Sequence, residues 1–392
     1  MNPFIIEHQV RITGKAVRRL KKGHLWIYAG DIASEPEEAS PAIVRVVDKS
    51  ENLLGYAFYS RNSQIRLRFF SRAEQVPTQD FLRTLIQRAV SRRQGYCKFG
   101  TACRLIFGEG DLLPAIIVDR YDRYLVLQTL SYGAETLKPF IREALIDLIH
   151  PAGILERNDS KARQLEGLES IQGVIYGEIP EEAEIEEDGI RFLINMRSGQ
   201  KTGFFLDQSR NRIACREYAF GRALDCFTNT GAFALHLARS CTSVTAVDIS
   251  ATSLSMARRN QKLNACDNVR FDESNVFDYL RELEKARQSF DTICLDPPAF
   301  AKSRKAFTAA RKGYKEINLR AIKLLNQEGV LITSSCSYHL SESDFLDIIS
   351  EAAQDAHRHI QIIERRGQAP DHPILAGMPE THYLKCFILR VI

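Results

Sequence analysis

The chain contains the run Arg222-Ala223-Leu224-Asp225-Cys226-Phe227-Thr228-Asn229-Thr230-Gly231-Ala232-Phe233. An apolar segment there leads into a short polar turn and then into a helical pattern, which predicts a strand, a tight loop and the start of a helix. Such a loop lets backbone N–H groups meet a polar ligand. Because Gly231 is its only glycine, the loop lacks the G-x-G-x-x-G pattern of dinucleotide-binding proteins, which argues against NAD. The alternative is an ordinary strand-to-helix turn.

From about residue 190 the same strand-then-helix pattern repeats. We expect strands near 222–227, 243–248, 268–272, 291–295 and 328–334 with helices between them, and two more strands at Ile360–Arg365 and Tyr383–Val391. This alternation is typical of an α/β fold with a largely parallel sheet and helices on both of its faces. In open sheets of this kind, ligands bind outside the carboxyl ends of the strands.

The first half of the chain has a different pattern. Residues 1–74 contain short alternating runs separated by turn residues, which predicts a small β-rich module with a basic segment at Lys15–Lys22. Residues 75–187 mix helical and strand patterns and are expected to form a middle α+β domain, followed by the α/β domain at residues 188–392. An acidic segment at Glu178–Asp188, with seven acids and no base, indicates the boundary before this last domain.

The composition excludes several classes of protein. With 392 residues, 44% hydrophobic and 26% charged, the chain has the composition of a globular protein, and a net charge of +4 does not by itself indicate a nucleic-acid binder. Its nine cysteines show no C-x-x-C pair and no Cys/His cluster at zinc spacing, so we expect a reducing compartment, no disulfide framework and no metal. No signal peptide and no membrane-spanning run is visible, which predicts a cytoplasmic protein.

Two polar residues follow the second and third predicted strands. Asp248 ends the run Thr245-Ala246-Val247 and lies 248 − 225 = 23 residues after Asp225. This is close to the spacing of a carboxylate that binds ribose hydroxyls in nucleotide-binding folds. The alternative is that Asp248 caps a helix that begins near Ala251. Asn275 is placed to bond an adenine edge, with a helix cap again as the alternative. We interpret the pair as a nucleoside site.

A carboxylate and a thiol end two further strands. Asp296-Pro297-Pro298 follows the run Thr292–Leu295, and its prolines fix the backbone beside the carboxylate, so that the loop could hold a planar base. The alternative is a plain strand-ending turn. Cys336 follows its strand among three serines, where backbone donors favour a thiolate nucleophile. Three other cysteines lie in apolar runs typical of buried residues, namely Cys226, Cys241 and Cys294.

Basic residues with interleaved aromatic residues follow the Asp-Pro-Pro segment. They are Lys302, Arg304, Lys305, Arg311, Lys312 and Lys315, with Phe300, Phe307 and Tyr314 nearby. This combination suits a phosphate backbone with stacked bases. The alternative is a solvated helical face.

Taken together, these residues resemble a known family. The motifs are Gln200-Lys201-Thr202-Gly203-Phe204-Phe205-Leu206-Asp207-Gln208, Phe227-x-x-Thr230-Gly231, Asp248, Asp296-Pro297-Pro298, Gly313-Tyr314-Lys315-x-Ile317-Asn318 and Ser335-Cys336-Ser337. The set is similar to the bacterial RNA cytosine-C5 methyltransferases, and most similar to the 23S ribosomal RNA large subunit methyltransferase I type. Residues 1–74 also resemble the PUA RNA-binding module of that family, so the likeness covers nearly the whole chain.

The resemblance implies a class I S-adenosylmethionine-dependent methyltransferase domain, Rossmann-like and with a mainly parallel seven-stranded sheet, preceded by the PUA module and the mixed middle domain. It implies that the cofactor S-adenosyl-L-methionine lies near Thr202, Phe205, Gln208, Phe227, Thr228, Gly231, Asp248, Asn275 and Asp296. It also implies that Cys336 is the nucleophile and that Asp296 binds the base. The residues expected to bind RNA are Lys15, Arg18, Arg19, Lys302 and Lys315.

Two positions depart from the family pattern. Asn275 stands where the family usually has Asp, although it keeps an acceptor for the adenine amino group. Pro298 and Ala299 follow Pro297, whereas a separate class of cytosine-C5 enzymes has a second cysteine in this motif. Cys336 is therefore expected to be the sole nucleophile.

The expected reaction is methylation of a cytosine C5 in 23S ribosomal RNA. Addition of the Cys336 thiolate to C6 makes C5 nucleophilic, and a general base must then remove the C5 proton. The sequence does not identify this base; Asp296 and an ordered water are candidates. Two other functions stay open: methylation of an exocyclic amino group by the Asp-Pro-Pro-Ala-Phe motif, which needs no thiol, and an inactive RNA-binding assembly factor. A homodimer is compatible with the sequence, which contains no feature that decides it.

Overall fold

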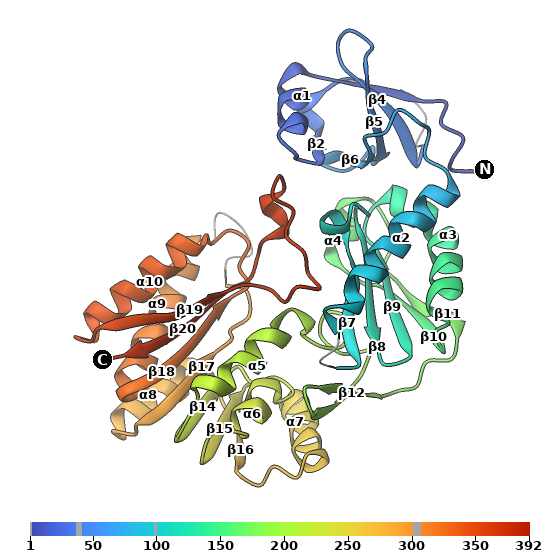
Figure 1. The fold of residues 1–392 in the computed structure, drawn as a ribbon. Helices are drawn as coiled ribbons and strands as arrows, with labels where there is room; N and C mark the ends of the chain where they lie inside the picture. Colours follow the sequence, from blue (N-terminus) through green and yellow to red (C-terminus); the bar gives the residue numbers. More distant parts are fainter. Residues whose placement is uncertain (1, 37–40, 98–99, 301–306) are drawn as a thin grey trace. The chain divides into compact units, whose positions relative to one another are not determined.

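The structure is a computed structural model and describes residues 2–36, 41–97, 100–300 and 307–392 (Figure 1). The chain divides into two compact units. The first comprises Met1–Ile185, Ile194–Leu206 and Pro370–Thr381, and the second comprises Glu186–Leu193, Asp207–Ala369 and His382–Ile392. Neither unit is one continuous stretch of sequence.

The first unit begins with a six-stranded sheet in the order β2-β6-β5-β4-β1-β3. Its elements are β1 (Gln9–Ile12), α1 (Gly14–Lys21), β2 (Trp26–Tyr28), the 3-10 turn η1 (Ala29–Asp31), β3 (Ile32–Ser34), β4 (Ile43–Val47), β5 (Leu53–Tyr59) and β6 (Ile65–Ser71). The predicted β-rich module therefore forms, and the basic segment is mostly helix α1. This helix begins where the Thr13 hydroxyl accepts a hydrogen bond from the Ala16 N–H. Apolar residues of β1, β4 and β6 pack with Met378, which returns from far along the chain.

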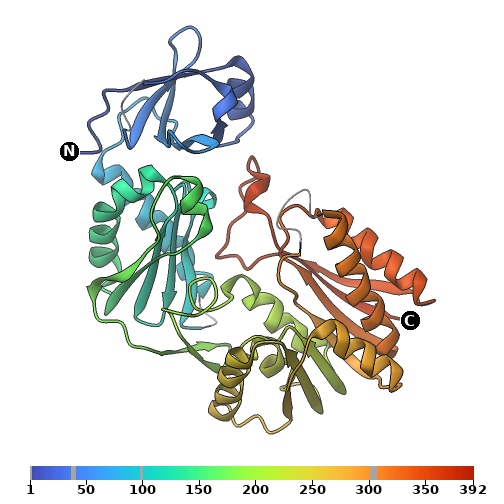
Figure 2. The same ribbon diagram turned by 180° about the vertical axis from the view of Figure 1, so that it is seen from behind.

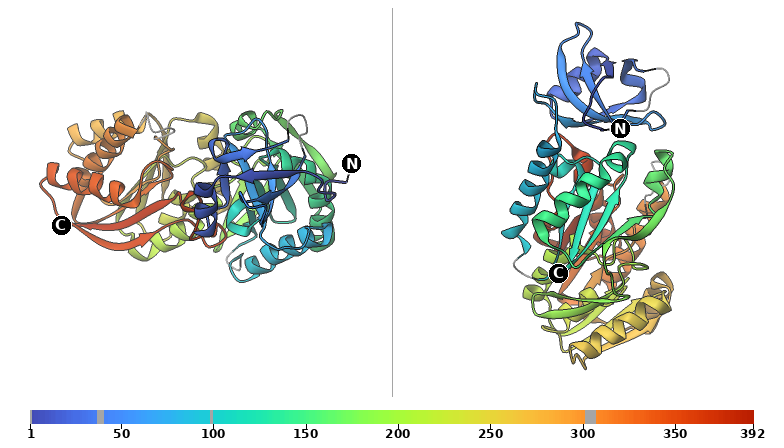
Figure 3. Two further views of the ribbon diagram at one scale, coloured as in Figure 1. Left: turned by 90° about the horizontal axis from the view of Figure 1, so that it is seen from above. Right: turned by 90° about the vertical axis from the view of Figure 1, so that its right-hand side faces the viewer.

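The second sheet of this unit is mixed, in the order β11-β10-β9-β8-β7, with only β9 and β10 parallel. Its elements are α2 (Gln79–Gln94), β7 (Ala102–Phe107), η3 (Gly108–Asp111), β8 (Ile116–Tyr121), β9 (Tyr124–Thr129), α3 (Tyr132–Ile149), β10 (Gly153–Asn158), α4 (Lys161–Leu165) and β11 (Ile171–Gly177). Helices α2 and α3 lie side by side and bury Ile86 and Ile141 with Val118 (Figures 1 and 3). Strands β12 (Ala183–Glu187) and β13 (Ile190–Ile194) form a separate two-stranded sheet, of which Glu186–Leu193 belongs to the second unit.

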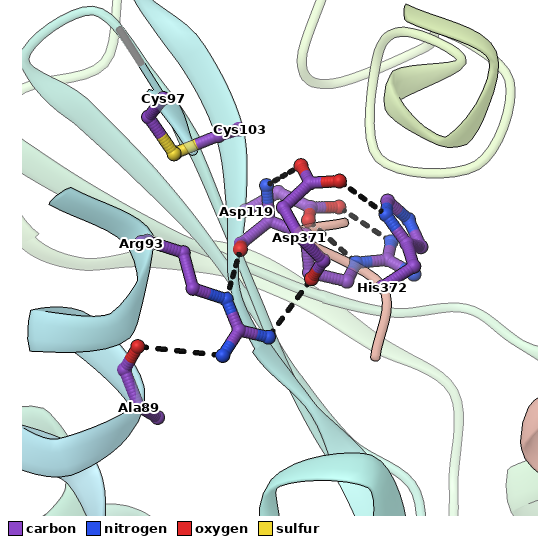
Figure 4. The surroundings of a disulfide bond; sticks show 8 residues. Ala89, Arg93, Cys97, Cys103, Asp119, Asp371 and His372 are labelled. Atoms are coloured by element: carbon purple, nitrogen blue, oxygen red, sulfur yellow. Dashed lines mark hydrogen bonds and ion pairs between the residues drawn. A yellow bond between two sulfur atoms is a disulfide. The ribbon is translucent and has the colours of Figure 1, made fainter. Parts of the chain in front are cut away.

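One disulfide is present, although the sequence led us to expect a reducing compartment and no disulfide framework. Cys97 and Cys103 are joined, with their Cα atoms 5.9 Å apart, at the turn between α2 and β7 (Figure 4). No sequence pattern signalled this pair. The remaining seven cysteines carry free thiols.

Beside the disulfide, Arg93 forms a buried network. Its guanidinium donates two hydrogen bonds of 2.6 Å to the Asp111 carboxylate and one of 2.8 Å to the Asp371 carbonyl. The Asp371 carboxylate in turn accepts the backbone N–H of Arg104 at 2.8 Å (Figure 4). The network fixes the returning segment Pro370–Thr381 in the first unit. A pocket of about 460 Å³ in this unit is lined mainly by apolar side chains, together with Arg72 and Arg88.

The second unit is built on a seven-stranded sheet in the order β16-β15-β14-β17-β18-β20-β19. Its elements are η4 (Leu206–Gln208, whose first residue belongs to the first unit), α5 (Ser209–Tyr218), β14 (Arg222–Cys226), α6 (Ala232–Leu237), β15 (Ser243–Asp248), α7 (Ala251–Leu263), β16 (Val269–Glu273), α8 (Val276–Lys285), β17 (Phe290–Leu295), α9 (Phe307–Leu324), β18 (Leu325–Ser335), α10 (Glu342–Asp355), β19 (Ile360–Arg366) and β20 (Lys385–Val391). The short 3-10 turn η6 (Pro379–Thr381) precedes β20 in the sequence and belongs to the first unit. All seven strands predicted for this region form, within a few residues of their expected ends.

The sheet is parallel except for β20, which runs antiparallel between β18 and β19. Helices α8, α9 and α10 cover one face, and α5, α6 and α7 cover the other (Figures 1 and 2). Because both faces are covered, the central strands are continuous apolar runs such as Ile293–Leu295 and Val330–Ile332. The strand order reverses between β14 and β17, so the ligand-binding edge is expected at their carboxyl ends. Among the described residues, no helix is both long enough and apolar enough to cross a membrane.

Candidate active site

The loop after β14 has the tight geometry expected from its sequence. Phe227, Asn229 and Gly231 all have left-handed backbone angles, with φ of 65°, 50° and 84°. A Cβ atom added at Gly231 would lie 3.3 Å from both the Ala257 side chain and the Phe271 ring. The glycine is therefore required by its backbone conformation and also leaves room for close packing of the loop.

Asp248 lies beside this loop at the end of β15. Its carboxylate accepts the backbone N–H of Asn229 and that of Ser250, each at 2.9 Å. The cap of α7 is Ser250, whose hydroxyl accepts from the Ser253 N–H, so the alternative of Asp248 as the helix cap is wrong. Asp248 instead orients the loop and presents a carboxylate at the edge of the sheet.

Asn275 does cap a helix. Its side-chain oxygen accepts the Phe277 N–H at 2.9 Å at the start of α8, and the residue is exposed. The alternative role is thus present in the structure. The carbonyl oxygen of an amide has two lone pairs, so that capping leaves one acceptor position for a ligand.

A second carboxylate, Asp225, lies buried beneath the loop. It accepts a hydrogen bond of 2.6 Å from the Thr228 hydroxyl. Burial raises the pKa of Asp225 to about 7; the bond from Thr228 opposes this rise, and the charge of Asp296 adds to it. Through the hydrogen bond from Thr228, Asp225 fixes the position of the loop.

Asp296 follows β17 at the next strand end. The Gln208 side-chain amide donates a hydrogen bond of 2.8 Å to the Asp296 carboxylate, and the Asn211 side chain donates one of 2.6 Å to the side-chain oxygen of Gln208. Gln208 and Asn211 are almost fully buried. This chain of amides fixes the orientation of the Asp296 carboxylate.

Cys336 lies against the same loop. Strands β17 and β18 pair in parallel with Leu295 opposite Thr333, which brings the residues after the two strands together. The Cys336 thiol lies 4.0 Å from the Pro297 carbonyl oxygen. Cys336 is partly exposed, whereas the other six free cysteines are buried. Burial raises the pKa of Cys226 and Cys294, as expected for cysteines that only pack in the core.

Hydroxyl groups surround the residues on either side of Cys336. The Ser335 hydroxyl donates to the Tyr314 hydroxyl at 3.0 Å, and the Tyr314 and Ser337 hydroxyls lie 2.9 Å apart. Tyr314 is fully buried and packs on Phe300, with ring centroids 4.7 Å apart. The expectation that Tyr314 stacks on RNA bases is therefore wrong: it supports the Cys336 turn from within the core.

Two residues expected near the cofactor belong to the first unit. The buried Thr202 hydroxyl donates to Asp119 and lies 2.8 Å from the Tyr121 hydroxyl. The Phe205 ring lies 4.7 Å from the Lys201 ammonium. Thr202 thus has structural partners within its own unit, which its sequence position did not indicate.

The residues expected to bind RNA differ in how far their charges are already neutralised. Lys15 and Arg18 are exposed on α1. Arg19 instead donates to Asp31 at 2.7 Å, and Lys315 lies 2.9 Å from Asp355. Lys302 lies outside the described residues. Of the described residues in this set, Lys15 and Arg18 are the exposed ones, and the binding of RNA by any of them stays a prediction.

Lys385 was missed entirely by sequence reasoning. It begins β20, its amine is buried beside the Cys336 turn, and it donates to the Ser337 carbonyl at 2.7 Å. No local pattern marks it, since it reaches the site through the pairing of β18 with β20. Among the described residues, no group of three or more His, Cys, Asp or Glu could hold a metal ion.

Comparison with known proteins gives consistent matches. A family model described as a PUA-like domain matches residues 10–72, and one described as an S-adenosylmethionine-dependent methyltransferase matches residues 165–389. The chain is 41% identical over 387 residues to the "Ribosomal RNA large subunit methyltransferase I" of Tolumonas auensis, with 96% of this chain and 97% of that protein covered. It is 40% identical to the proteins of that name from Klebsiella pneumoniae strain 342, with 96% of each chain covered, and Escherichia coli strain SMS-3-5, with 96% of this chain and 97% of that protein covered.

Among solved structures, the fold is similar to that of SMU.776, described as a putative methyltransferase complexed with SAH. The TM-score is 0.84 at 21% identity, with 97% of this chain and 99% of that chain covered. A putative SAM-dependent methyltransferase from Streptococcus mutans gives a TM-score of 0.83, also at 21% identity and with the same coverage. At this identity the likeness concerns the fold.

Proposed function

The chain belongs to the family of the ribosomal RNA large subunit methyltransferases I, and we propose that it transfers the methyl group of S-adenosylmethionine to C5 of a cytosine in large-subunit ribosomal RNA through a covalent adduct with Cys336. The observation that carries the proposal is the position of the partly exposed Cys336 thiol, 4.0 Å from the carbonyl of Pro297 in the Asp-Pro-Pro loop. A nucleophile and a base-holding loop at adjacent strand ends are what this reaction needs.

The cofactor, S-adenosylmethionine, is assigned to the carboxyl ends of β14, β15 and β16. The residues there fit it: the Asp248 carboxylate suits ribose hydroxyls, Asn275 retains an acceptor for the adenine amino group, and Gly231 allows the left-handed turn of the loop between them. When bound, the cofactor supplies a methyl group activated by a sulfonium. Asp225 and the loop residues with left-handed backbone angles fix the conformation of the loop at this edge of the sheet.

Cys336 makes the cytosine reactive. C5 of cytosine is a poor nucleophile, and addition of the thiolate to C6 gives an enamine in which C5 can accept the methyl group. Transfer of the C5 proton to a general base, for which Asp296 and an ordered water are the candidates, then allows the bond between Cys336 and C6 to break, which restores the thiolate and the aromatic ring. One difficult step is thereby divided into easier ones.

Asp296 is assigned to the base. The Asp296 carboxyl group, held by Gln208, hydrogen-bonds N3 and the amino group of the cytosine, and a proton shared with N3 offsets the negative charge that builds on the ring when the thiolate adds. The two prolines after Asp296 fix the loop against the ring. A base inside a helix must first leave its stack to reach Cys336.

The decisive experiment compares methyl transfer by Cys336→Ala and Cys266→Ala on large-subunit ribosomal RNA. We expect Cys336→Ala to bind S-adenosylmethionine normally and to lose methyl transfer, because only the nucleophile is removed. Cys266 is a buried free cysteine, so that its variant controls for loss of a thiol as such. Undiminished transfer by Cys336→Ala, or a methyl group found on the exocyclic nitrogen in the wild-type product, would overturn the proposal.

A further inference from the structure

Lys385 lies next to the proposed nucleophile. In the antiparallel pairing of β18 with β20, Lys385 is directly opposite Ser335, the residue before Cys336. Its Nζ atom donates to the Ser337 carbonyl, the residue after Cys336, at 2.7 Å. Lys385 therefore spans the turn that carries the thiol.

The amine is buried without a carboxylate partner. Only 3% of Lys385 is exposed, and its second hydrogen bond goes to the Tyr383 carbonyl at 2.8 Å. Among the described residues it forms no ion pair, whereas Lys138 and Lys323 each pair with glutamates. Burying an unpaired ammonium is costly, so the proton on this amine is held less tightly than on an exposed lysine.

Burial lowers the pKa of Lys385 from 10.5 to about 8. The groups that act on it in the opposite direction are Cys336 after β18 and two carboxylates at the start of α10, Asp344 and Glu342. With two N–H groups bound to carbonyls, one tetrahedral direction about Nζ is left, which holds a lone pair in the neutral amine and an N–H in the ammonium. Both forms are thus compatible with the same two hydrogen bonds.

We propose that Lys385 favours ionisation of Cys336: the neutral amine takes up the proton that the thiol releases, and the resulting ammonium stabilises the nearby thiolate. The S–H bond breaks and an N–H bond forms, with no change in the total charge or in the number of electrons. When the cysteine is expelled at the end of the reaction, the proton returns from nitrogen to sulfur. This inference rests on the proposed function only in that it takes Cys336 to be the nucleophile.

Lys385 acts through Cys336 and is therefore a positioning residue. A purely structural lysine would hold the turn by its bonds to Ser337 and Tyr383 and would leave the thiol pKa unchanged. The ionising role instead predicts a wild-type thiol pKa below the value of about 8.5 of a free cysteine. Measurement of the pKa of the Cys336 thiol therefore distinguishes the two roles.

The test is the pH dependence of alkylation of Cys336 by iodoacetamide, followed by mass spectrometry on the peptide that contains it. The buried free cysteines react slowly, which isolates this site. In Lys385→Met we expect the thiol pKa to rise by about one unit and alkylation at neutral pH to slow by up to about tenfold. Lys385→Arg keeps a positive charge and should keep the low thiol pKa. Lys323→Met, which removes an exposed lysine of the same unit, should behave as the wild type.

An unchanged thiol pKa in a folded Lys385→Met variant would refute the inference. If that variant does not fold, the wild-type profile decides, because a thiol pKa at or above about 8.5 also refutes it. Failure of the proposed function is distinguishable: methyl transfer by Cys336→Ala would disprove the covalent reaction whatever the titration shows. Conversely, the titration can fail while Cys336 remains essential.

Discussion

Substitution Glu187→Gln should destabilise the second unit strongly, because Glu187 is the buried centre of an ion-pair cluster. From the end of β12 its carboxylate accepts two hydrogen bonds of 2.6 Å from Arg212 on α5. His236 on α6 lies 3.0 Å from the same carboxylate. Burial lowers the pKa of His236, so that Arg212 is the charged partner at neutral pH. Glutamine keeps the shape of the side chain and leaves the Arg212 charge buried and uncompensated.

The magnitude follows from the pKa of Glu187. Burial alone would raise it, but Arg212 and then His236 hold it at about 2, against an ordinary value of 4.5. That difference corresponds to about 3 kcal/mol. Breaking a buried pair by removing one partner costs a similar amount, roughly 3–5 kcal/mol. We therefore expect the free energy of unfolding of the second unit to fall by about 3 kcal/mol at pH 7.

The pH dependence has a definite sign. A carboxyl group with a lowered pKa in the folded state contributes stability above its unfolded pKa, and this contribution is lost as the pH falls through the folded value. The difference between wild type and Glu187→Gln should be constant down to about pH 4.5 and should shrink towards pH 2. Urea unfolding followed by far-UV circular dichroism measures it. The only tryptophan, Trp26, lies in the first unit, so its fluorescence reports that unit separately.

Glu186→Gln is the matched control, since it makes the same change in charge at the exposed neighbouring residue. It should alter stability by less than about 0.5 kcal/mol. A loss below about 1 kcal/mol in Glu187→Gln, or a loss that stays the same at low pH, would refute the reasoning.

Three further outcomes are expected. Gly231→Ala should weaken S-adenosylmethionine binding, measured by calorimetry, by about tenfold or more, because its Cβ enters a strained loop with contacts at 3.3 Å; unchanged affinity would contradict this. Cys97→Ser should lower the stability of the first unit by ~2 kcal/mol without reductant and by little with it, since the disulfide to Cys103 closes only a short loop; fluorescence-monitored unfolding under both conditions decides. Lys15→Gln should reduce the salt dependence of RNA binding by about one charge, whereas Lys315→Gln, whose lysine is already paired, should reduce it less; equal slopes would refute the distinction.

The sheet of the second unit could be predicted because its strands carry their own signals. Buried parallel strands are continuous apolar runs, and here Asp248, Asp296 and Cys336 each follow such a run. Since parallel strands end at one edge, the three polar residues were expected to gather there before any contact was known. The sequence did not distinguish a ligand-binding role from a helix-capping role for Asp248. The hydrogen bonds of the structure did, since they show that Ser250 caps α7.

Features that depend on pairing over long distances in the chain could not be predicted. Lys385 faces Ser335 because β20 inserts antiparallel beside β18, and nothing local fixes that register. The ion pair between Lys315 on α9 and Asp355 on α10 depends on how these two helices pack against each other. The sequence therefore did not reveal that the charge of Lys315 is already paired. Asp371 joins Arg93 across 278 residues of sequence. In each case the charge was visible in the sequence and its partner was not.

The division of the chain also bears on how the protein is made. The chain passes between the two units after residues 185, 193, 206, 369 and 381. During synthesis from the N-terminus, the buried guanidinium of Arg93 must wait for Asp371, and Leu25 must wait for Met378, until almost the whole polypeptide has left the ribosome. The first unit therefore begins to fold first, but its fold is completed only after residues 370–381 have been synthesised. The two units thus complete their folding together rather than one after the other.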